Sequence, residues 1–307
     1  MPSRPKGARE RPHLEKPLHD FRTLLQTLTD QDGTFLVLGR TDVGKSTLLQ
    51  NLVRLITARR RSVAVLDADL GQSTYGLPTT LNLVRFSPEV APPTPECVAS
   101  IFIGATSPVG HLLPTLVGCR RLLDRARQLR AHSILIDTTG LVEGPLAVEF
   151  KLHKIDLLQP AHLLALARAS ELDPILVACA RRADLHMHRL PVAPAARERS
   201  AEERRVNRRE KYQRYFTDLV RHRLRLNRVV IWGRCPQRSG RDLTGLLIGL
   251  NDEQGFCLGV GLLQDQTASA VEVLTPLTTV RGVKILRFGS VALDTDGNEH
   301  FVPAREW

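Results

Sequence analysis

The sequence predicts an α/β protein with a doubly wound, mostly parallel sheet, followed by a charged helix and a small antiparallel β domain. From Gly33 to about residue 196, short buried-strand runs alternate with segments of helical apolar spacing, as expected for strands joined by crossover helices. Residues 197–226 are densely charged, and short β-type runs separated by turn sequences follow. We therefore divide the chain into an N-terminal arm (1–32), an α/β domain (33–196), a basic helical region (197–226) and a C-terminal β domain (227–307).

The first elements of the α/β domain form one strand–helix–strand unit. Residues 34–38 are a buried-strand run, and apolar residues recur at helical spacing from Leu48 to Ile56. Three consecutive arginines at 59–61 end the helix, and 62–66 is the next strand. This order predicts parallel pairing of the two strands.

The remaining elements follow the same alternation. Residues 87–95 are rich in proline and predict a surface loop. We expect helices at 112–129, 145–158 and 173–180, and strands at 133–136, 162–166 and 185–190. The C-terminal domain has β-type runs at 229–232, 244–250, 256–263, 271–274 and 283–293, with turns at 251–255 and 294–297.

Charge and composition narrow the function classes. Forty-three Lys and Arg residues against 32 acidic ones give a net charge of +11, which favours polyanionic partners such as nucleic acid. The apolar runs are too short to span a bilayer, and the first ten residues do not resemble a secretion signal, so we expect a cytoplasmic protein without membrane contact. The five cysteines contain no CxxC pair, which favours buried thiols over disulfides or zinc. His186 and His188 share one face of a strand, where we expect a structural role.

One segment matches a phosphate-binding pattern throughout. The sequence GRTDVGKST fits GxxxxGK[ST] and lies between a buried strand and an amphipathic helix. Its glycines let backbone N–H groups point at phosphate oxygens, and the helix N-terminus adds partial positive charge. A lysine on the β- and γ-phosphates and a hydroxyl on Mg²⁺ complete such a site. We therefore expect ATP to contact Gly39, Arg40, Thr41, Asp42, Val43, Gly44, Lys45, Ser46 and Thr47, with Ser46 as a metal ligand.

Two further strands end in carboxylates. Asp67 and Asp69 stand in DADLGQS after the second strand, and Asp137 begins DTTG after a later one. A carboxylate beside a P-loop can hold Mg²⁺ or take a proton from an attacking hydroxyl. Spacing alone does not decide which acid is the base and which serves the metal.

These motifs together resemble the polynucleotide 5′-hydroxyl kinase family, the P-loop RNA-processing kinases of the mRNA cleavage/polyadenylation factor and pre-rRNA processing type. The shared series is the P-loop, DxDxGQS, a TxPxG-like element, [DN]TxG and a basic helix, over about residues 33–216. The chain is similar to the small prokaryotic-type members.

The resemblance implies roles for individual residues. Asp69 would be the catalytic base and a metal partner, beside Asp137 as a metal residue. Arg204 and Arg208, with RxxxR spacing on one helix face, would close over the transferring phosphoryl as a lid, so the implied catalytic set is Lys45, Asp69, Arg204 and Arg208. The implied substrate contacts are Gln72, Thr106, Ser107 and Thr138.

The chain departs from the family in three places. Thirty-two residues before the P-loop domain are too few for the extra N-terminal β domain of larger members. Leu141 stands where several relatives have a Trp that stacks on a base. Thr106, Ser107 and Pro108 stand where the family has a Thr/Pro clasp that positions the substrate end, and His111 stands where this clasp ends in Asn.

The resemblance implies an ATP- and Mg²⁺-dependent 5′-hydroxyl kinase acting on single-stranded RNA or DNA ends. Two alternatives remain. One is a non-catalytic scaffold that holds ATP, and the other is a regulatory P-loop NTPase that uses DTTG as a switch. A GTPase predicts an NKxD-type motif, which the sequence lacks. Small-molecule kinases also remain, although the arginine excess and the separate charged helix argue against them.

Overall fold

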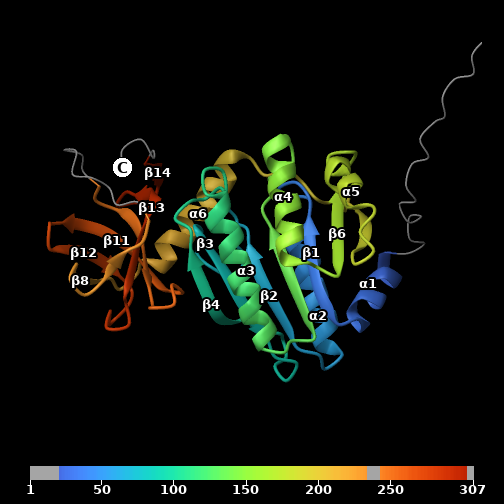
Figure 1. Cartoon of the computed structure of the whole chain (residues 1–307), viewed down its shortest axis with the longest axis horizontal. Coiled ribbons are helices and arrows are strands. Elements are labelled where there is room, and N and C mark those ends of the chain that lie inside the picture. Colours follow the sequence, from blue (N-terminus) through green and yellow to red (C-terminus); the bar gives the residue numbers. More distant parts are fainter. Residues whose placement is uncertain (1–20, 234–242, 303–307) are drawn as a thin grey trace, which may run out of the picture.

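The computed structural model describes residues 21–233 and 243–302 and contains two sheets joined by a helix (Figure 1). The first sheet has the strand order β4-β3-β2-β5-β1-β6-β7. Its parallel strands are β2 (Val63–Ala68), β5 (Ser133–Thr138), β1 (Gly33–Leu38), β6 (His162–Ala167) and β7 (His186–Pro191). An antiparallel hairpin of β3 (Thr80–Phe86) and β4 (Glu96–Phe102) extends one edge. The predicted mostly parallel sheet is confirmed.

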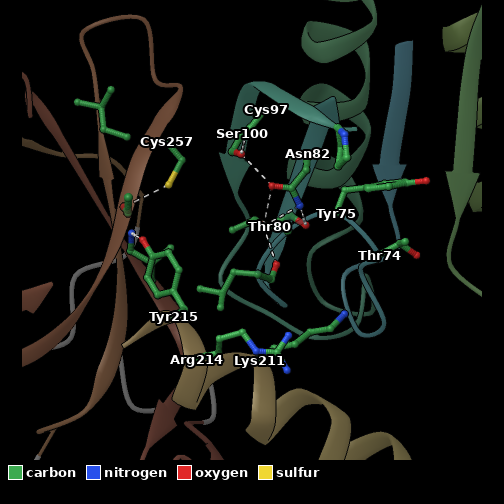
Figure 2. A pocket seen from close by; sticks show the side chains of 16 residues that line it. Thr74, Tyr75, Thr80, Asn82, Cys97, Ser100, Lys211, Arg214, Tyr215 and Cys257 are labelled. Carbon is green, nitrogen blue, oxygen red and sulfur yellow. Dashed lines mark hydrogen bonds between the residues drawn. The ribbon is translucent and has the colours of Figure 1, made fainter. Parts of the chain in front are cut away.

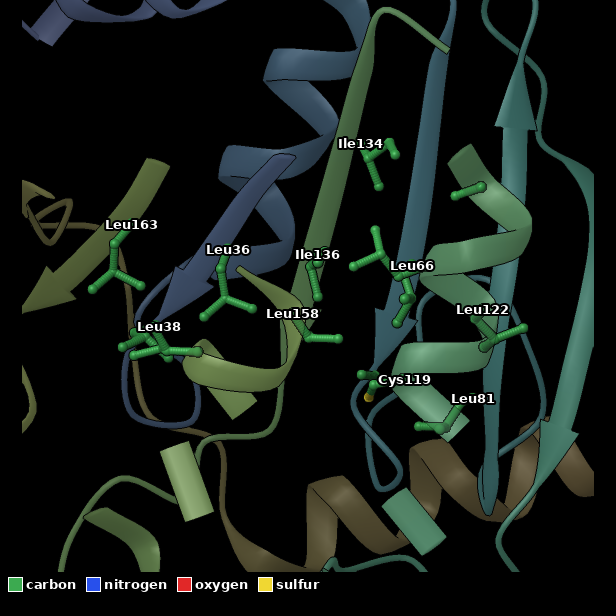
Figure 3. Close-up of a cluster of buried hydrophobic side chains, with 14 of the residues drawn as sticks. Leu36, Leu38, Leu66, Leu81, Cys119, Leu122, Ile134, Ile136, Leu158 and Leu163 are labelled. Carbon is green, nitrogen blue, oxygen red and sulfur yellow. The ribbon is translucent and has the colours of Figure 1, made fainter. Parts of the chain in front are cut away.

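Helices cover both faces of this sheet because successive strand residues point to opposite sides. Phe35 and Val37 pack with α1 (Phe21–Asp30) and α2 (Lys45–Ala58). Leu36 and Leu38 belong to the opposite core with α3 (Leu112–Gln128), α4 (Pro145–Leu158) and α5 (Asp173–Cys179). Figure 3 shows this second core, where side chains of α3 and α4 lie against the strands. Each fully buried aliphatic side chain contributes about 1.5–3 kcal/mol, so both helical layers are firmly held.

The second sheet is antiparallel along its main path and follows α6 (Ala201–Tyr215). A capping box starts α6, because the Ser200 hydroxyl accepts from the Glu203 N–H and the Glu203 carboxylate accepts from the Ser200 N–H. The strand order is β14-β13-β10-β11-β12-β8, and β9 (Val230–Ile231) pairs in parallel with β13. The other strands are β8 (Val220–Arg225), β10 (Leu246–Asn251), β11 (Cys257–Gln266), β12 (Ala270–Thr275), β13 (Ile285–Leu293) and β14 (Glu299–Phe301).

The structure corrects the expected extent of the charged helix. We expected helical structure through Arg225, but α6 ends at Tyr215 and residues 220–225 form β8, which pairs along its whole length with β12. Alternation explains the outcome, since Leu224 is buried in the sheet core while Arg221, Arg223 and Arg225 are exposed. The hairpin β3–β4 and the short strand β14 were not predicted.

The two sheets are held together by close packing around Phe102. This side chain joins a buried cluster with Tyr212 of α6 and Leu247 of β10. Gly104 and Gly289 allow the chain after β4 to touch β13, since a Cβ added at Gly104 would lie 2.5 Å from the Gly289 Cα. The Ser290 N–H donates to the Gly104 carbonyl at 2.7 Å. The loop after β4 is thereby fixed against the C-terminal sheet.

In the described residues, no helix has the length and apolar character needed to cross a membrane.

Candidate active site

The P-loop lies between the end of β1 and the start of α2, as predicted. Gly39, Asp42 and Gly44 have positive φ values of 156°, 63° and 95°. A Cβ at Gly39 would lie 2.7 Å from the Leu166 carbonyl oxygen, so this tight turn requires glycine. Lys45 begins α2 with a buried side chain, and its Nζ donates to the Arg40 carbonyl at 2.8 Å. The ammonium group is therefore folded into the concave side of the loop, where phosphate oxygens would lie.

Three carboxylates, Asp67, Asp69 and Asp137, lie at the carboxyl ends of β2 and β5. Ser46 donates its hydroxyl to Asp137 Oδ2 at 2.7 Å, which joins the P-loop to β5. Asp67 is buried, and its Oδ2 accepts from the Ser73 hydroxyl and from two main-chain N–H groups. Asp69 is only partly buried, and its Oδ1 accepts from the Gly71 and Gln72 N–H groups. The two acids of DADLGQS therefore have different roles.

Burial and mutual repulsion shift the pKa values of the deeper acids. Burial, together with the nearby Asp137 carboxylate, raises the pKa of Asp67 to about 7. Burial also raises the pKa of Asp137, although Lys45 opposes this shift. A divalent cation near these groups would offset the repulsion, and carboxylate and hydroxyl oxygens suit Mg²⁺.

Two cavities open beside these residues. The first, of about 610 Å³, is lined by the P-loop from Thr41 to Thr47 and by the segment between Pro191 and Arg199. The second, of about 200 Å³, is lined by Thr106, Ser107, Pro108, residues 139–141 and two arginines of α6, Arg204 and Arg208. We call it the clasp cavity. Thr41, Asp69 and Gln72 line both, so the two cavities meet at the Asp69 carboxylate.

The predicted substrate contacts divide into two groups. Thr106, Ser107 and Gln72 line the clasp cavity. Thr138 is completely buried, and its hydroxyl donates to the Val37 carbonyl at 2.8 Å. Thr138 thus joins β5 to β1, whereas the next residue, Thr139, lines the cavity.

The start of α6 is tied to the P-loop. Arg204 donates to Asp42 Oδ2 at 3.1 Å, and Arg199 donates to Asp42 Oδ1 at 2.7 Å. Burial alone would raise the pKa of Asp42, but hydrogen bonds from both arginines lower it below the usual value. Gln72 accepts from Asn207 at 2.9 Å and donates to the Arg204 carbonyl at 3.3 Å. These contacts hold α6 over the point where the cavities meet.

The two lid arginines have different partners. Arg204 and Arg208 both line the clasp cavity, as their i, i+4 spacing predicts. Arg208 donates through Nε to Glu299 of β14 at 2.8 Å, and its Nη2 donates to the other carboxylate oxygen. The C-terminal sheet therefore supplies the partner of one predicted lid residue.

Residues 39–218, more than half of the chain, match the model of the family described as the mRNA cleavage and polyadenylation factor CLP1 P-loop. The chain belongs to this family. The resemblance inferred from the sequence motifs is thereby confirmed.

Two curated relatives match this chain over most of their length, and a third matches over a short part. A polyribonucleotide 5′-hydroxyl-kinase of Pyrococcus furiosus is 29% identical over 88% of this chain and 90% of its own. One from Methanocaldococcus jannaschii is 28% identical over 86% of this chain and 88% of its own. A polynucleotide 5′-hydroxyl-kinase of Debaryomyces hansenii is 31% identical over 36% of this chain and 18% of its own.

Solved structures confirm the fold of the CLP1 P-loop chain. A structure of a wild-type Clp1p–Pcf11p complex superposes with a TM-score of 0.64 at 12% identity, covering 90% of this chain and 80% of that one. A second structure, titled for the Pcf11p–Clp1p interface and for ATP loss in a point mutant, has a TM-score of 0.65 at 12% identity, covering 88% and 78%.

Three residues at this site were not predicted from the sequence, namely Arg199, Glu299 and Lys151. Arg199 stands 157 positions from Asp42 and Glu299 stands 91 from Arg208, so no local pattern indicates either pair. Lys151 of α4 is completely buried, and its Nζ donates to the Thr139 carbonyl at 2.7 Å. Burial lowers the pKa of Lys151 well below its usual value. The helical spacing that predicted α4 gave no sign that this lysine points inward.

A further cleft of about 640 Å³ lies between α6, the β3–β4 hairpin and β11 of the second sheet (Figure 2). Lys211, Arg214 and Tyr215 of α6 face it, with Asn82 and Ser100 of the β3–β4 hairpin opposite. Lys211 donates to the Ser73 carbonyl, and the Tyr215 hydroxyl accepts from the Val260 N–H at 2.8 Å. None of the described residues that line this cleft belongs to the P-loop, and none is a strand-end acid. The candidate reaction site is therefore the pair of smaller cavities.

Proposed function

We propose that this chain is an ATP-dependent polynucleotide 5′-hydroxyl kinase that transfers the γ-phosphate of ATP to the 5′-hydroxyl of RNA, DNA or both. The observation that carries the proposal is the position of Asp69, where the P-loop cavity meets the clasp cavity. A transferase with two substrates requires such a junction, because donor and acceptor must approach in line. The names of the relatives support this reaction.

ATP is proposed to bind in the first cavity with its phosphates on the P-loop, from Gly39 to Thr47. The main-chain N–H groups and Lys45 would hold the β- and γ-phosphates. The segment from Pro191 to Ala196 lines the same cavity with small apolar side chains, including Ala193 and Ala195. We assign this segment to the adenosine end of the nucleotide.

The donor set at Ser46 fits Mg²⁺. The described residues contain no cluster of three His, Cys or acidic side chains arranged to hold a metal. Magnesium often takes only one or two protein oxygens and completes its shell with water and phosphate. The Ser46 hydroxyl and Asp137, with Asp69 nearby, would supply those oxygens. The ion would neutralise charge on the β- and γ-phosphates.

Different side chains are proposed to move the proton and to stabilise the charge during phosphoryl transfer. The acceptor 5′-oxygen forms a bond to the γ-phosphorus, the bond from that phosphorus to the β,γ-bridging oxygen breaks, and ADP leaves. Asp69 takes the hydroxyl proton through Oδ2, since Oδ1 already accepts two main-chain N–H groups. Lys45, Arg204 and Arg208 stabilise charge on the transferring group.

The acceptor end is proposed to lie in the clasp cavity against Thr106, Ser107 and Gln72. The structure favours Thr139 over Thr138 as the contact from the DTTG segment, because Thr138 uses its hydroxyl within the sheet. We propose single-stranded RNA or DNA 5′ ends as partners and a cytoplasmic location, and we retain the division into 1–32, 33–196, 197–226 and 227–307. Residues 1–20 of the N-terminal arm lie outside the described residues.

Transfer of labelled γ-phosphate from ATP to 5′-hydroxyl RNA and DNA oligonucleotides tests the proposal. Wild type should label at least one acceptor, Lys45→Ala should abolish labelling, and Asp69→Asn should lower its rate by at least about 10²-fold. Lys284→Ala and Asp156→Asn, which change an exposed lysine and an exposed carboxylate outside both cavities, should leave it intact. A folded wild type that binds ATP but labels no acceptor would contradict the proposal and favour an ATP-holding scaffold.

A further inference from the structure

A third cavity, of about 370 Å³, shares the loop after β4 with the clasp cavity and has aromatic side chains in its lining. Val109, Gly110 and His111 line it, and they immediately follow the clasp residues Thr106–Pro108 in the chain. The opposite wall comes from the C-terminal sheet and its edge, with Trp232, Arg287 and Phe301. Consecutive residues of one loop therefore form the walls of two neighbouring cavities.

The aromatic side chains of this cavity are unusually exposed. Trp232 is 59% exposed and Phe301 is 71% exposed. Exposed apolar side chains that gather around one cavity can mark a binding surface, and both side chains present flat apolar faces on which a planar ligand can stack. Val109 of the clasp loop, 52% exposed, extends the same surface.

Arg287 gives the cavity a positive charge. Its guanidinium lies 5.6 Å from the Trp232 ring centre, and it donates to the Phe102 carbonyl at a long 3.4 Å. Burial and the nearby Arg121 lower the pKa of Arg287, and none of the carboxylates in residues 21–233 and 243–302 forms an ion pair with it. A half-buried guanidinium without an acidic partner is suited to a phosphate.

The strand β14 connects this cavity to the lid. Glu299, the partner of Arg208, and Phe301 stand two residues apart, so their side chains leave the same face of the strand. Two strand residues span about 7 Å. The Ser290 hydroxyl also contacts His111 Nε2 at 3.2 Å, which fixes the clasp loop against this wall. The two cavities are thus held at a short, fixed separation.

We propose that the third cavity binds a nucleotide of the acceptor strand downstream of the 5′ end, with its base stacked on Trp232 and Phe301 and a phosphate bound by Arg287. This inference rests on the proposed kinase function and names a second acceptor subsite. It also places an aromatic platform on the C-terminal sheet. Stacking on aromatic rings with backbone contacts from Arg is how proteins bind single strands with little sequence preference.

Fluorescence measures the stacking without requiring phosphate transfer. The chain has two tryptophans, Trp232 and Trp307, so Trp307→Phe leaves Trp232 as the only indole. A 5′-hydroxyl RNA tetranucleotide, or its DNA equivalent, should quench this emission. An abasic site stepped along the strand should remove the quench at one position other than the first. An unchanged emission with saturating oligonucleotide would overturn the inference.

Kinetics supply the second readout. Trp232→Ala should raise the KM for a tetranucleotide roughly tenfold or more, with a smaller effect on a nucleoside 3′-monophosphate, and Trp232→Phe should restore most of the loss. Val230→Ala, which alters an exposed apolar residue outside the cavity, serves as the matched control. Arg287→Met should reduce the dependence of log affinity on log salt by about one.

The outcomes separate this inference from the function on which it rests. Absence of transfer by wild type would refute the kinase, whereas quenching would still support nucleotide binding in the third cavity. Transfer with the same KM for wild type and Trp232→Ala at every length, and without quenching, would refute the subsite and leave the aromatic surface to a protein partner. Thermal unfolding of each variant checks that the fold is kept.

Discussion

At the scale of single residues, the two acids of DADLGQS show how position within one turn separates structural and chemical roles. Asp67 is buried and accepts three hydrogen bonds at Oδ2 from the following loop. Asp69, two residues later, reaches both reaction cavities. The sequence left open which acid is the base, and the surroundings of each side chain favour Asp69.

Exchanging each acid for its amide should separate these roles. Asp69→Asn removes the proton acceptor and should lower the transfer rate by about 10²- to 10⁴-fold, with ATP binding retained. Asp67→Asn cannot satisfy all the donors around Oδ2 and should reduce the free energy of unfolding by about 1–3 kcal/mol. Transfer kinetics and urea unfolding of both variants check the prediction. A catalytic loss confined to Asp67→Asn would reverse the assignment.

At the scale of elements, the position of α6 over the site depends on its contacts with the P-loop. The residues of α6 are almost all polar, and the buried residue among them is Tyr212. Asp42 of the P-loop holds it through Arg199 and Arg204, and Asp42 is only 4% exposed whereas the two arginines are 38% and 31% exposed. The helix therefore depends on the P-loop for its position.

Asp42→Asn should loosen this attachment. The neutral amide keeps one acceptor but loses the charge that strengthens both hydrogen bonds. We expect faster hydrogen exchange of amides in α6 and a higher KM for ATP, while the amides of β1 and β5 keep their protection. Asp156→Asn, which changes an exposed acid on α4, is the control. Equal exchange in wild type and Asp42→Asn would mean that the packing of Tyr212 and the contacts of α6 with Gln72 and Glu299 fix the helix without Asp42.

At the edge of the first sheet formed by β6 and β7, the buried His162 should make the stability of the fold depend on pH. His162 stacks on Phe35 with ring centres 4.6 Å apart, and its Nδ1 lies 3.2 Å from His188 Nε2. Burial, together with His188 and His186, lowers the pKa of His162 to about 4. The structural role expected for His186 and His188 remains an interpretation. Among the described residues, no metal cluster includes either of them.

Lowering the pH should destabilise the fold by protonating His162. Because the folded-state pKa of His162 is depressed, its contribution is fully present above the unfolded value of 6.5 and is lost as pH falls toward 4. Between pH 7 and pH 5 the loss should be about 2 kcal/mol. Urea midpoints at the two pH values measure it. His162→Phe, which keeps the stacking, should flatten the dependence, and exposed His153→Gln should leave it unchanged.

At the scale of the whole molecule, the fold was more predictable than the site. Periodicity found the parallel strands of the first sheet and the helices α2 to α5 that cover them, because their apolar faces are local features of the sequence, but it missed the β3–β4 hairpin at the edge of that sheet. It failed for residues 220–225, because their dense charge indicated a helix, whereas the alternating side chains pair as a strand with β12, about fifty residues further along the chain. The pairs Asp42–Arg199 and Arg208–Glu299 depend on tertiary folding, so the sequence predicted the motif residues but not their partners.

The C-terminal sheet should therefore influence phosphate transfer through Glu299. Arg208 and Glu299 are 15% and 16% exposed, and the carboxylate accepts from both Nε and Nη2, which fixes the guanidinium where it lines the clasp cavity. If Arg208 stabilises the transferring phosphoryl, Arg208→Ala should lower kcat by about 10³-fold. Glu299→Gln keeps one acceptor for the guanidinium but removes the charge, so a smaller loss, about tenfold, should follow because Arg208 is less well positioned. Arg208→Ala combined with Glu299→Gln should be no slower than Arg208→Ala alone, since Glu299 acts only through that arginine. Single-turnover transfer measures the four proteins, and additive losses in the double variant would show that Glu299 contacts the acceptor by a separate route.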